Sequence, residues 1–163
     1  MLKKISIALA AAAALSANIA NAGQLDSSAF TVQATVAGAC TTVTPLSVFN
    51  FGTLIGTSGN ADSQMNVSVT CSNTLPYNLA ISYGQSGSFN RAMKNGTNTL
   101  TYNLYTDSGR TNVLGDTTFN AAGWIGGTGS GATQNLTVYG RVPIQTSPVA
   151  GVYTDSLIAS VIW

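Results

Sequence analysis

Apolar and polar residues alternate over short stretches of this chain, as they do in β-strands that bury one face. The two-residue period recurs in residues 30–36, 65–71, 79–81, 100–104, 136–144 and 157–163. Clusters of Gly, Asn, Ser and Asp separate these stretches, and no stretch beyond residue 22 keeps a helical period. The pattern predicts one all-β domain, a sandwich or a barrel, without an internal repeat.

Two of the glycine clusters carry more specific predictions. Asn95-Gly96 is a strong hairpin signal, because a type I′ turn needs positive φ at both central residues. Residues 126–131 are rich in glycine but lack the lysine and the helix of a phosphate-binding loop. We therefore expect residues 126–131 to form a flexible loop.

Residues 1–22 have the three parts of a secretory signal peptide. Lys3 and Lys4 supply positive charge, residues 5–19 are apolar, and Ala20 and Ala22 suit signal peptidase. The apolar stretch is too short to span a bilayer comfortably. Cleavage after residue 22 would leave about 140 residues, the size of one domain, outside the cytoplasm.

The alternating stretch at residues 30–36 follows a polar leader, residues 23–28, and precedes the first cysteine. It has two interpretations, which periodicity alone does not separate. It is either an ordinary first strand or a detachable strand whose apolar face belongs in another molecule. In both cases that face consists of Phe30, Val32, Ala34 and Val36.

The two cysteines, Cys40 and Cys71, would both enter an oxidising compartment after export. A disulfide between them is the natural prediction. The alternative is a metal site, but the sequence contains no histidine and no glutamate to complete a ligand set.

The chain is poor in ionisable and catalytic groups. Charged residues make up 7% of it, against about 25% in ordinary globular proteins, and no basic patch could hold nucleic acid. The five acidic residues are isolated aspartates, mostly beside turn residues, and no histidine could activate a serine. We therefore expect no enzyme activity, no catalytic residue, no cofactor and no metal. Trp124 could form a sugar platform, although core packing is the commoner use of an indole.

Three groups of motifs, in this order, resemble the spore coat protein U domain family. They are Phe-Thr-Val-Gln-Ala-Thr-Val (30–36) with Phe-Asn-Phe-Gly-Thr (49–53), Leu-Thr-Tyr-Asn-Leu-Tyr-Thr-Asp (100–107) with Val-Leu-Gly-Asp (113–116), and Ala-Gly-Val-Tyr-Thr-Asp-Ser (150–156). The resemblance covers nearly all of the chain after residue 22. Within the family it is nearest to the major shaft subunit of Csu-type archaic chaperone–usher pili.

The resemblance implies an incomplete immunoglobulin-like β-sandwich, completed by a donor strand from another subunit. A periplasmic chaperone would fill the groove first, and the next subunit's N-terminal segment would replace it at the outer-membrane usher. Residues 23–37 would then be the donor segment, with Phe30, Val32, Ala34 and Val36 as its inserted face. The sandwich would comprise residues 38–163. Its groove wall and chaperone contact would be Leu157, Ala159, Val161 and Trp163, with the carboxylate of Trp163 as the chaperone anchor.

The function implied is that of a structural pilin. Such a subunit is secreted through the periplasm, forms a homopolymer in a cell-surface fimbrium, joins other pilus subunits including a tip adhesin, and supports attachment and biofilm formation. A leader strand favours a shaft position over the tip, because a tip subunit has no subunit ahead of it to complete. The alternatives are a spore coat protein and a secreted monomeric β-sandwich that binds carbohydrate through Trp124 and residues 126–131.

Overall fold

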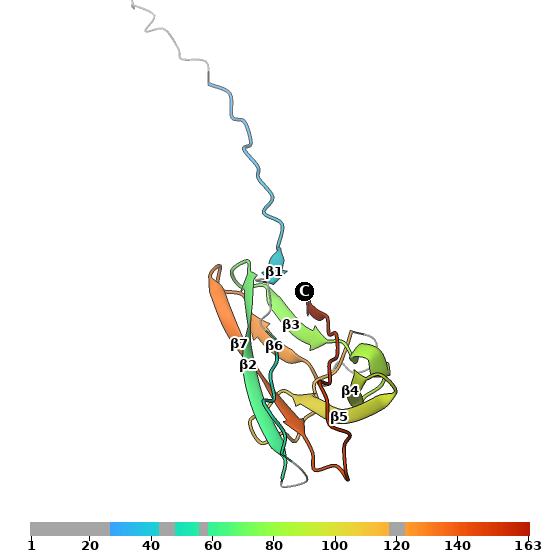
Figure 1. The fold of residues 1–163 in the computed structure, drawn as a ribbon. Coiled ribbons are helices and arrows are strands. Elements are labelled where there is room, and N and C mark those ends of the chain that lie inside the picture. The colour runs from blue at the N-terminus through green and yellow to red at the C-terminus, as the bar shows by residue number, and fades with distance from the viewer. Residues whose placement is uncertain (1–26, 43–47, 56–58, 118–122) are drawn as a thin grey trace, which may run out of the picture. The chain divides into compact units, whose positions relative to one another are not determined.

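Two antiparallel β-sheets make up the ordered body of the chain in the computed structural model (Figure 1). The structure describes residues 27–42, 48–55, 59–117 and 123–163, so the predicted signal peptide, residues 1–22, lies outside the described residues. Residues 1–35 and residues 36–163 are two separate units. In the first unit, the described residues 27–35 form no strand.

The strands of the second unit are arranged in a larger and a smaller sheet. The larger sheet has five described strands, in the order β1 (Cys40–Thr42), β2 (Ala61–Cys71), β7 (Thr133–Val142), β5 (Asn98–Tyr105) and β4 (Arg91–Asn95). The smaller has three described strands, β6 (Ile125–Thr128), β3 (Pro76–Ile81) and β8 (Ala159–Ile162). A short 3₁₀ turn, η1 (Gly84–Ser86), follows β3. The expected all-β class is confirmed, and the two sheets form a sandwich.

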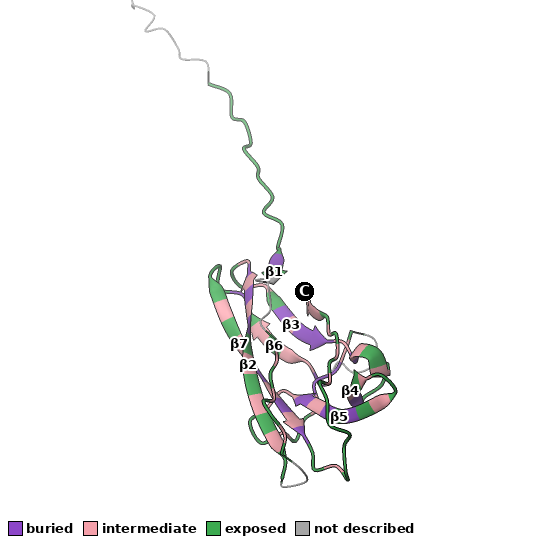
Figure 2. Cartoon of the chain, in the orientation of Figure 1, coloured by how far each residue is buried: buried purple, intermediate pink, exposed green. Residues whose placement is uncertain are grey.

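The core lies between the two sheets, where the alternating apolar residues meet (Figure 2). Val67 and Val69 on β2 are fully buried, while the polar residues between and beside them stay accessible. β3 differs because Leu79, Ala80 and Ile81 are all buried in succession. β3 lies between β6 and β8, and both of its faces are covered at this end. A strand covered on both faces can be apolar on both, because neither face contacts water.

The predicted disulfide is present and joins Cys40 to Cys71. The two residues are also directly opposite each other in the register between β1 and β2. Their side chains form a small cluster with Val69 and Tyr77. The bond therefore fastens the first strand of the sandwich to its second across a buried contact.

A buried cation links the sheets at the end of β3. Arg91 on β4 is fully buried, and its guanidinium donates to the carbonyl oxygens of Ile81 at 2.7 Å, Leu114 at 2.9 Å and Ser82 at 3.0 Å. It also lies over the ring of Tyr83, 4.9 Å from the centroid. Burial lowers the pKa of Arg91, and the three carbonyl oxygens offset part of the cost of desolvating the charge.

The C-terminal segment crosses from one sheet to the other. Thr154 exchanges two backbone hydrogen bonds with Lys94 on β4, at 2.8 and 3.0 Å, and the chain then moves to the edge of β3 as β8. At this corner the hydroxyl of Tyr153 donates to the carbonyl oxygen of Val149, four residues upstream, at 2.8 Å. Such a tyrosine corner is a hallmark of immunoglobulin-like sandwiches.

The predicted flexible loop was wrong, whereas the predicted hairpin after β4 is present but with a different turn type. Within residues 126–131, the first three belong to β6, and a Cβ on Gly127 would lie 2.6 Å from the Tyr77 ring. Gly129 is buried and bonded to the backbone of Leu75, so these glycines permit close packing and not flexibility. In the hairpin, Asn95 pairs with Asn98, which leaves Gly96 as the first central residue. Only Gly96 of the two central residues has positive φ, at 60°, as in a type II′ turn.

Candidate functional site

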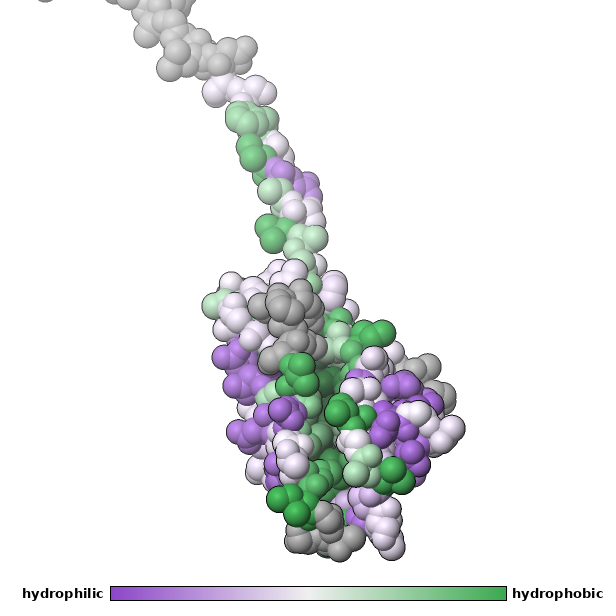
Figure 3. Space-filling view, in the orientation of Figure 1, coloured by the Kyte–Doolittle hydropathy of each residue, from purple (hydrophilic) through white to green (hydrophobic). Residues whose placement is uncertain are grey.

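An apolar cleft of about 310 Å³ opens between the two sheets. The space-filling view shows it as a hollowed hydrophobic band running down one face of the domain (Figure 3). Its lining comes from both sheets and from two irregular segments: Val48, Phe49, Phe51, Met65, Ile81, Met93, Tyr102, Leu104, Tyr153, Thr154, Asp155, Leu157 and Ala159. A surface of this kind usually receives an apolar partner.

One side of the cleft is formed by β8 and the residues just before it. The register pairs Ala159 with Ile81 and Ile162 with Asn78, so the inner edge of β8 is bonded to β3. Among the described residues no strand pairs with its outer edge. Unpaired backbone N–H and C=O groups on a strand edge form a template for another strand. The open edge therefore lies directly beside the apolar cleft.

The four residues predicted as the groove wall do not all point the same way. Leu157 and Ala159 line the cleft, and both pack against the core together with Val161. Trp163 is 60% exposed and is not among the cleft residues. The alternating face from Leu157 to Val161 is therefore placed as a wall would require, while Trp163 lies apart from it. Their role in binding remains a prediction.

The opposite side of the cleft is a segment that the sequence analysis did not assign to the site. Residues 48–55 form no strand, and they run beside the C-terminal segment in Figure 1. The rings of Phe49 and Phe51 pack at a tilt of 42° with centroids 5.1 Å apart, and Phe51 contacts the ring of Tyr102 edge-on, with centroids 5.8 Å apart. The hydroxyl of Ser63 donates to the carbonyl oxygen of Asn50 at 2.6 Å. Aromatic packing, more than a strand ladder, holds this wall in place.

A glycine on β7 makes room for the two rings. A Cβ on Gly140 would lie 2.6 Å from the ring of Phe49 and 2.9 Å from that of Phe51. In the sequence Phe49-Asn50-Phe51, the two-residue spacing of the aromatic residues could have indicated that both rings face the cleft. The position of this wall could not be inferred, because the glycine that receives it lies about 90 residues later.

Replacing that glycine tests how the wall is held. We expect Gly140→Ala to lower the free energy of unfolding by about 1–3 kcal/mol, because the added methyl group overpacks the rings. In a double-mutant cycle with Phe49→Ala, measured by urea unfolding, the alanine at position 140 should cost much less once the ring is gone. Thr137→Ala, on the outer face of the same strand, is the matched control. Additive effects of the two substitutions would show that the rings do not dock on this glycine.

The polar end of the cleft is organised by Asp155. Its carboxylate accepts hydrogen bonds from the Tyr102 hydroxyl at 2.8 Å, from the backbone N–H of Gln85 at 2.9 Å and from that of Ser156 at 2.8 Å. Burial, and then the hydrogen bond to Asp155, raise the pKa of Tyr102, so the phenol remains a donor. The carboxylate also presses against Gly84, which has φ of 64° and leaves no space for a side chain. These contacts anchor the C-terminal segment just before β8.

The predicted donor residues lie in an extended, uncovered stretch. Residues 27–39 form no strand. Phe30 is 86% exposed, Val32 is 83% exposed and Val36 is 92% exposed, and Ala34 is also exposed. The large apolar side chains of this alternating face are thus all exposed. Their use as a donor strand remains a prediction.

The remaining candidate sites carry no comparable chemistry. Among the described residues no group of three His, Cys, Asp or Glu side chains could hold a metal ion, and no described helix is long and apolar enough to cross a membrane. Trp124 is half-buried, with its indole N–H donating to the carbonyl oxygen of Asp116 at 2.8 Å. Gly126 and Gly127 belong to β6, so the alternative carbohydrate site lacks the flexible loop expected there.

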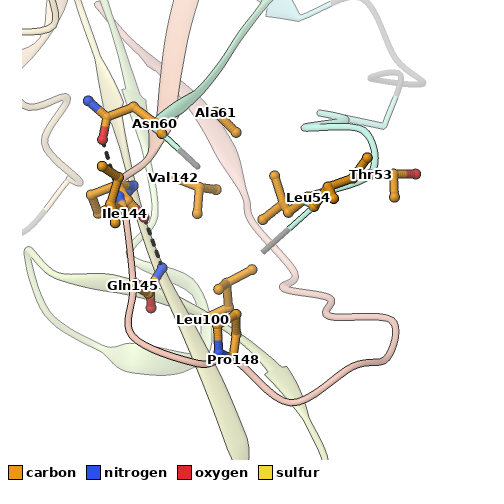
Figure 4. Close-up of a pocket in the computed structure, with 12 residues that line it drawn as sticks. Thr53, Leu54, Asn60, Ala61, Leu100, Val142, Ile144, Gln145 and Pro148 are labelled. Atoms are coloured by element: carbon orange, nitrogen blue, oxygen red, sulfur yellow. Dashed lines mark hydrogen bonds between the residues drawn. The ribbon is translucent and has the colours of Figure 1, made fainter. Parts of the chain in front are cut away.

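A second, smaller hollow of about 180 Å³ lies at the other end of β2 and β7 from the disulfide (Figure 4). Leu54, Val142 and Pro148 line it, and its rim is tied by a hydrogen bond from the Ile144 N–H to the Asn60 side chain at 3.1 Å. Its lining includes Ile55 and Gly59, and the residues between these two in sequence lie outside the described part of the chain. It therefore receives no functional assignment.

Comparison with known proteins agrees with this architecture. A model of the spore coat protein U domain matches residues 26–160. No curated protein matches the sequence. The fold is similar to a chain in the crystal structure of the CsuC–CsuE chaperone–tip adhesion subunit pre-assembly complex, from the archaic chaperone–usher Csu pili of Acinetobacter baumannii, with a TM-score of 0.55 and 21% sequence identity. The match covers 79% of this chain and 41% of that chain, so the present chain spans less than half of its solved relative. With a family match over most of its length, the chain belongs to the spore coat protein U domain family.

Proposed function

We propose that this chain is a structural pilus subunit whose cleft accepts a β-strand from another protein. The observation that carries the proposal is the open outer edge of β8 beside the apolar cleft. A strand added there would bond its backbone to β8 and place every second side chain in the cleft. The fold shared with a chain of a chaperone–usher pilus complex supports the same function.

The occupant of the cleft changes during assembly in this proposal. A periplasmic chaperone covers it after export, and at the outer-membrane usher the N-terminal segment of another copy replaces the chaperone strand. Residues 23–37 are the donor segment, residues 38–163 form the pilin sandwich, and Phe30, Val32, Ala34 and Val36 enter the cleft. The product is a homopolymeric shaft in a surface fimbrium that carries other subunits, including a tip adhesin, and supports attachment and biofilm formation.

Three contributions set the free energy of inserting the donor strand. Burial of Phe30, Val32 and Val36 would contribute about 1.5–3 kcal/mol for each side chain. Each new backbone hydrogen bond would add about 0.5–1.5 kcal/mol. Ordering the extended segment costs about 1–2 kcal/mol per residue, so the net gain depends on filling the whole cleft.

Electron microscopy and size-exclusion chromatography of material released from the cell surface test the proposal. We expect filaments of high mass that separate into single chains only under denaturing conditions. A soluble monomer that binds carbohydrate, and loses that binding when Trp124 is replaced by alanine, would contradict the pilus function. That outcome would favour the carbohydrate-binding alternative.

A further inference from the structure

Two methionines lie in the lining of the cleft, on strands separated by two others in the larger sheet. Met65 comes from β2 and Met93 from β4, and both side chains are half-buried against the core. The sequence contains three methionines, and the third, Met1, belongs to the predicted signal peptide. Every methionine expected in the exported chain therefore lines this one cleft.

The neighbours of the two thioethers are much less accessible. Leu104 is 1% exposed, Ile81 and Tyr102 are each 4% exposed, and these three side chains form the deeper part of the lining. A methionine is flexible and polarisable, so it can fill an empty cleft and repack when a strand enters. Because both methionines are only half-buried, we expect small oxidants to reach them while the cleft is empty.

The rest of the described chain offers oxidants few comparable targets. Both cysteines are joined in the disulfide, with Cys40 8% exposed and Cys71 1% exposed, and no free cysteine is present among the described residues. Thioether oxidation converts an apolar group into a polar sulfoxide, which disrupts apolar packing. The effect on the molecule would therefore be concentrated at the cleft.

We propose that Met65 and Met93 make strand acceptance sensitive to oxidation. This inference rests on the proposed function of the cleft. A two-electron oxidant such as hydrogen peroxide transfers one oxygen atom to the thioether sulfur, the sulfur is oxidised to a sulfoxide, and the peroxide is reduced to water. The sulfoxide oxygen then lies without a donor in the path of the incoming strand. An inserted strand covers both sulfurs, so the complemented subunit is protected and the empty one is not.

A labelled peptide is a direct probe of this site. The full exported chain, purified as a monomer, is mixed with a fluorescent peptide of the sequence of residues 27–39, before and after mild peroxide treatment. We expect oxidation to weaken binding by about tenfold for each sulfoxide, because each buries an unpaired polar group. Mass spectrometry should find one added oxygen on each of the two methionine peptides. The preformed complex should take up oxygen much more slowly.

The matched control is the double variant Met65→Leu/Met93→Leu, which keeps the volume and apolar character of both side chains. It should bind the peptide before and after peroxide with equal affinity. Equal binding of oxidised and untreated wild-type chain would overturn the inference and leave the proposed function intact. So would loss of binding by the oxidised leucine variant, since the damage would then lie elsewhere. If the untreated chain does not bind the peptide, both the proposed function and this inference fail.

Discussion

Subunits that carry Val32→Asp should fold and be recovered with their chaperone, but they should not join a filament through their own N-terminal segment. Val32 is 83% exposed in the isolated chain, and exposed substitutions usually change stability by less than about 0.5 kcal/mol. Inserted into a cleft, the same aspartate would be an unpaired carboxylate in an apolar site, at a cost of several kcal/mol. Filament yield, measured by electron microscopy and by the fraction of high-mass protein, should fall to near zero.

The matched control is Gln33→Asp, which adds the same charge to the opposite face of the strand. We expect this variant to assemble, with a modest loss at most. The Val32→Asp subunit should still accept a wild-type donor peptide, because its own cleft is unchanged. If Val32→Asp instead prevents recovery of a folded subunit, residues 30–36 act as an internal first strand. Normal filaments from this variant would exclude both roles.

Removal of the disulfide should cause the largest loss of subunit stability. Cys40 and Cys71 close a loop with a sequence separation of 31, for which the chain-entropy model gives about 3.5–4 kcal/mol. The loss is large because small domains are stable by only about 5–15 kcal/mol. We expect Cys40→Ala/Cys71→Ala to lower the free energy of unfolding by about 2–5 kcal/mol in urea, and to lower the yield of exported subunit.

Chemical reduction of the wild-type chain should reproduce most of this loss. Thr41→Ala is the control in the same short strand, and an exposed threonine of this kind should change stability by less than about 0.5 kcal/mol. Free thiols in correctly exported protein, or a double variant as stable as the wild type, would contradict the role given to the bond.

The alternating apolar pattern predicted the longer strands well. Residues 65–71 belong to β2 and residues 100–104 to β5, and in both strands the predicted apolar residues point into the core. The last predicted stretch was too long, because β8 covers only Ala159–Ile162. Period-2 patterning works for these strands because one face is buried and the other is solvated.

Three of the described strands escaped the pattern: β1, which has only three residues, and β4 and β6, whose packing is unusual. β4 begins with Arg91, and a charged residue does not usually indicate a buried strand. Here the buried guanidinium donates hydrogen bonds to three backbone carbonyl oxygens. β6 is Ile-Gly-Gly-Thr, in which Gly127 leaves space for the ring of Tyr77. In β4 and β6 the residue type is explained by tertiary partners outside the strand itself. The wall at residues 48–55 was missed for the same reason.

The cysteine pair and the two-residue period could be inferred from the sequence, because each is a local feature or involves a pair with no competitor, while the export signal stays a prediction. The family motifs added the expectation of a donor strand and of a groove with one wall at residues 157–163, but they did not indicate the second wall at residues 48–55. Which strand edge stays open followed only from the tertiary structure. β3 pairs with β8 through Asn78 and Ile162, more than 80 residues apart, and β6 takes its other edge. Strand order depends on such long-range pairings, which side-chain periodicity does not encode. The resulting order leaves the outer edge of β8 unpaired within the described chain.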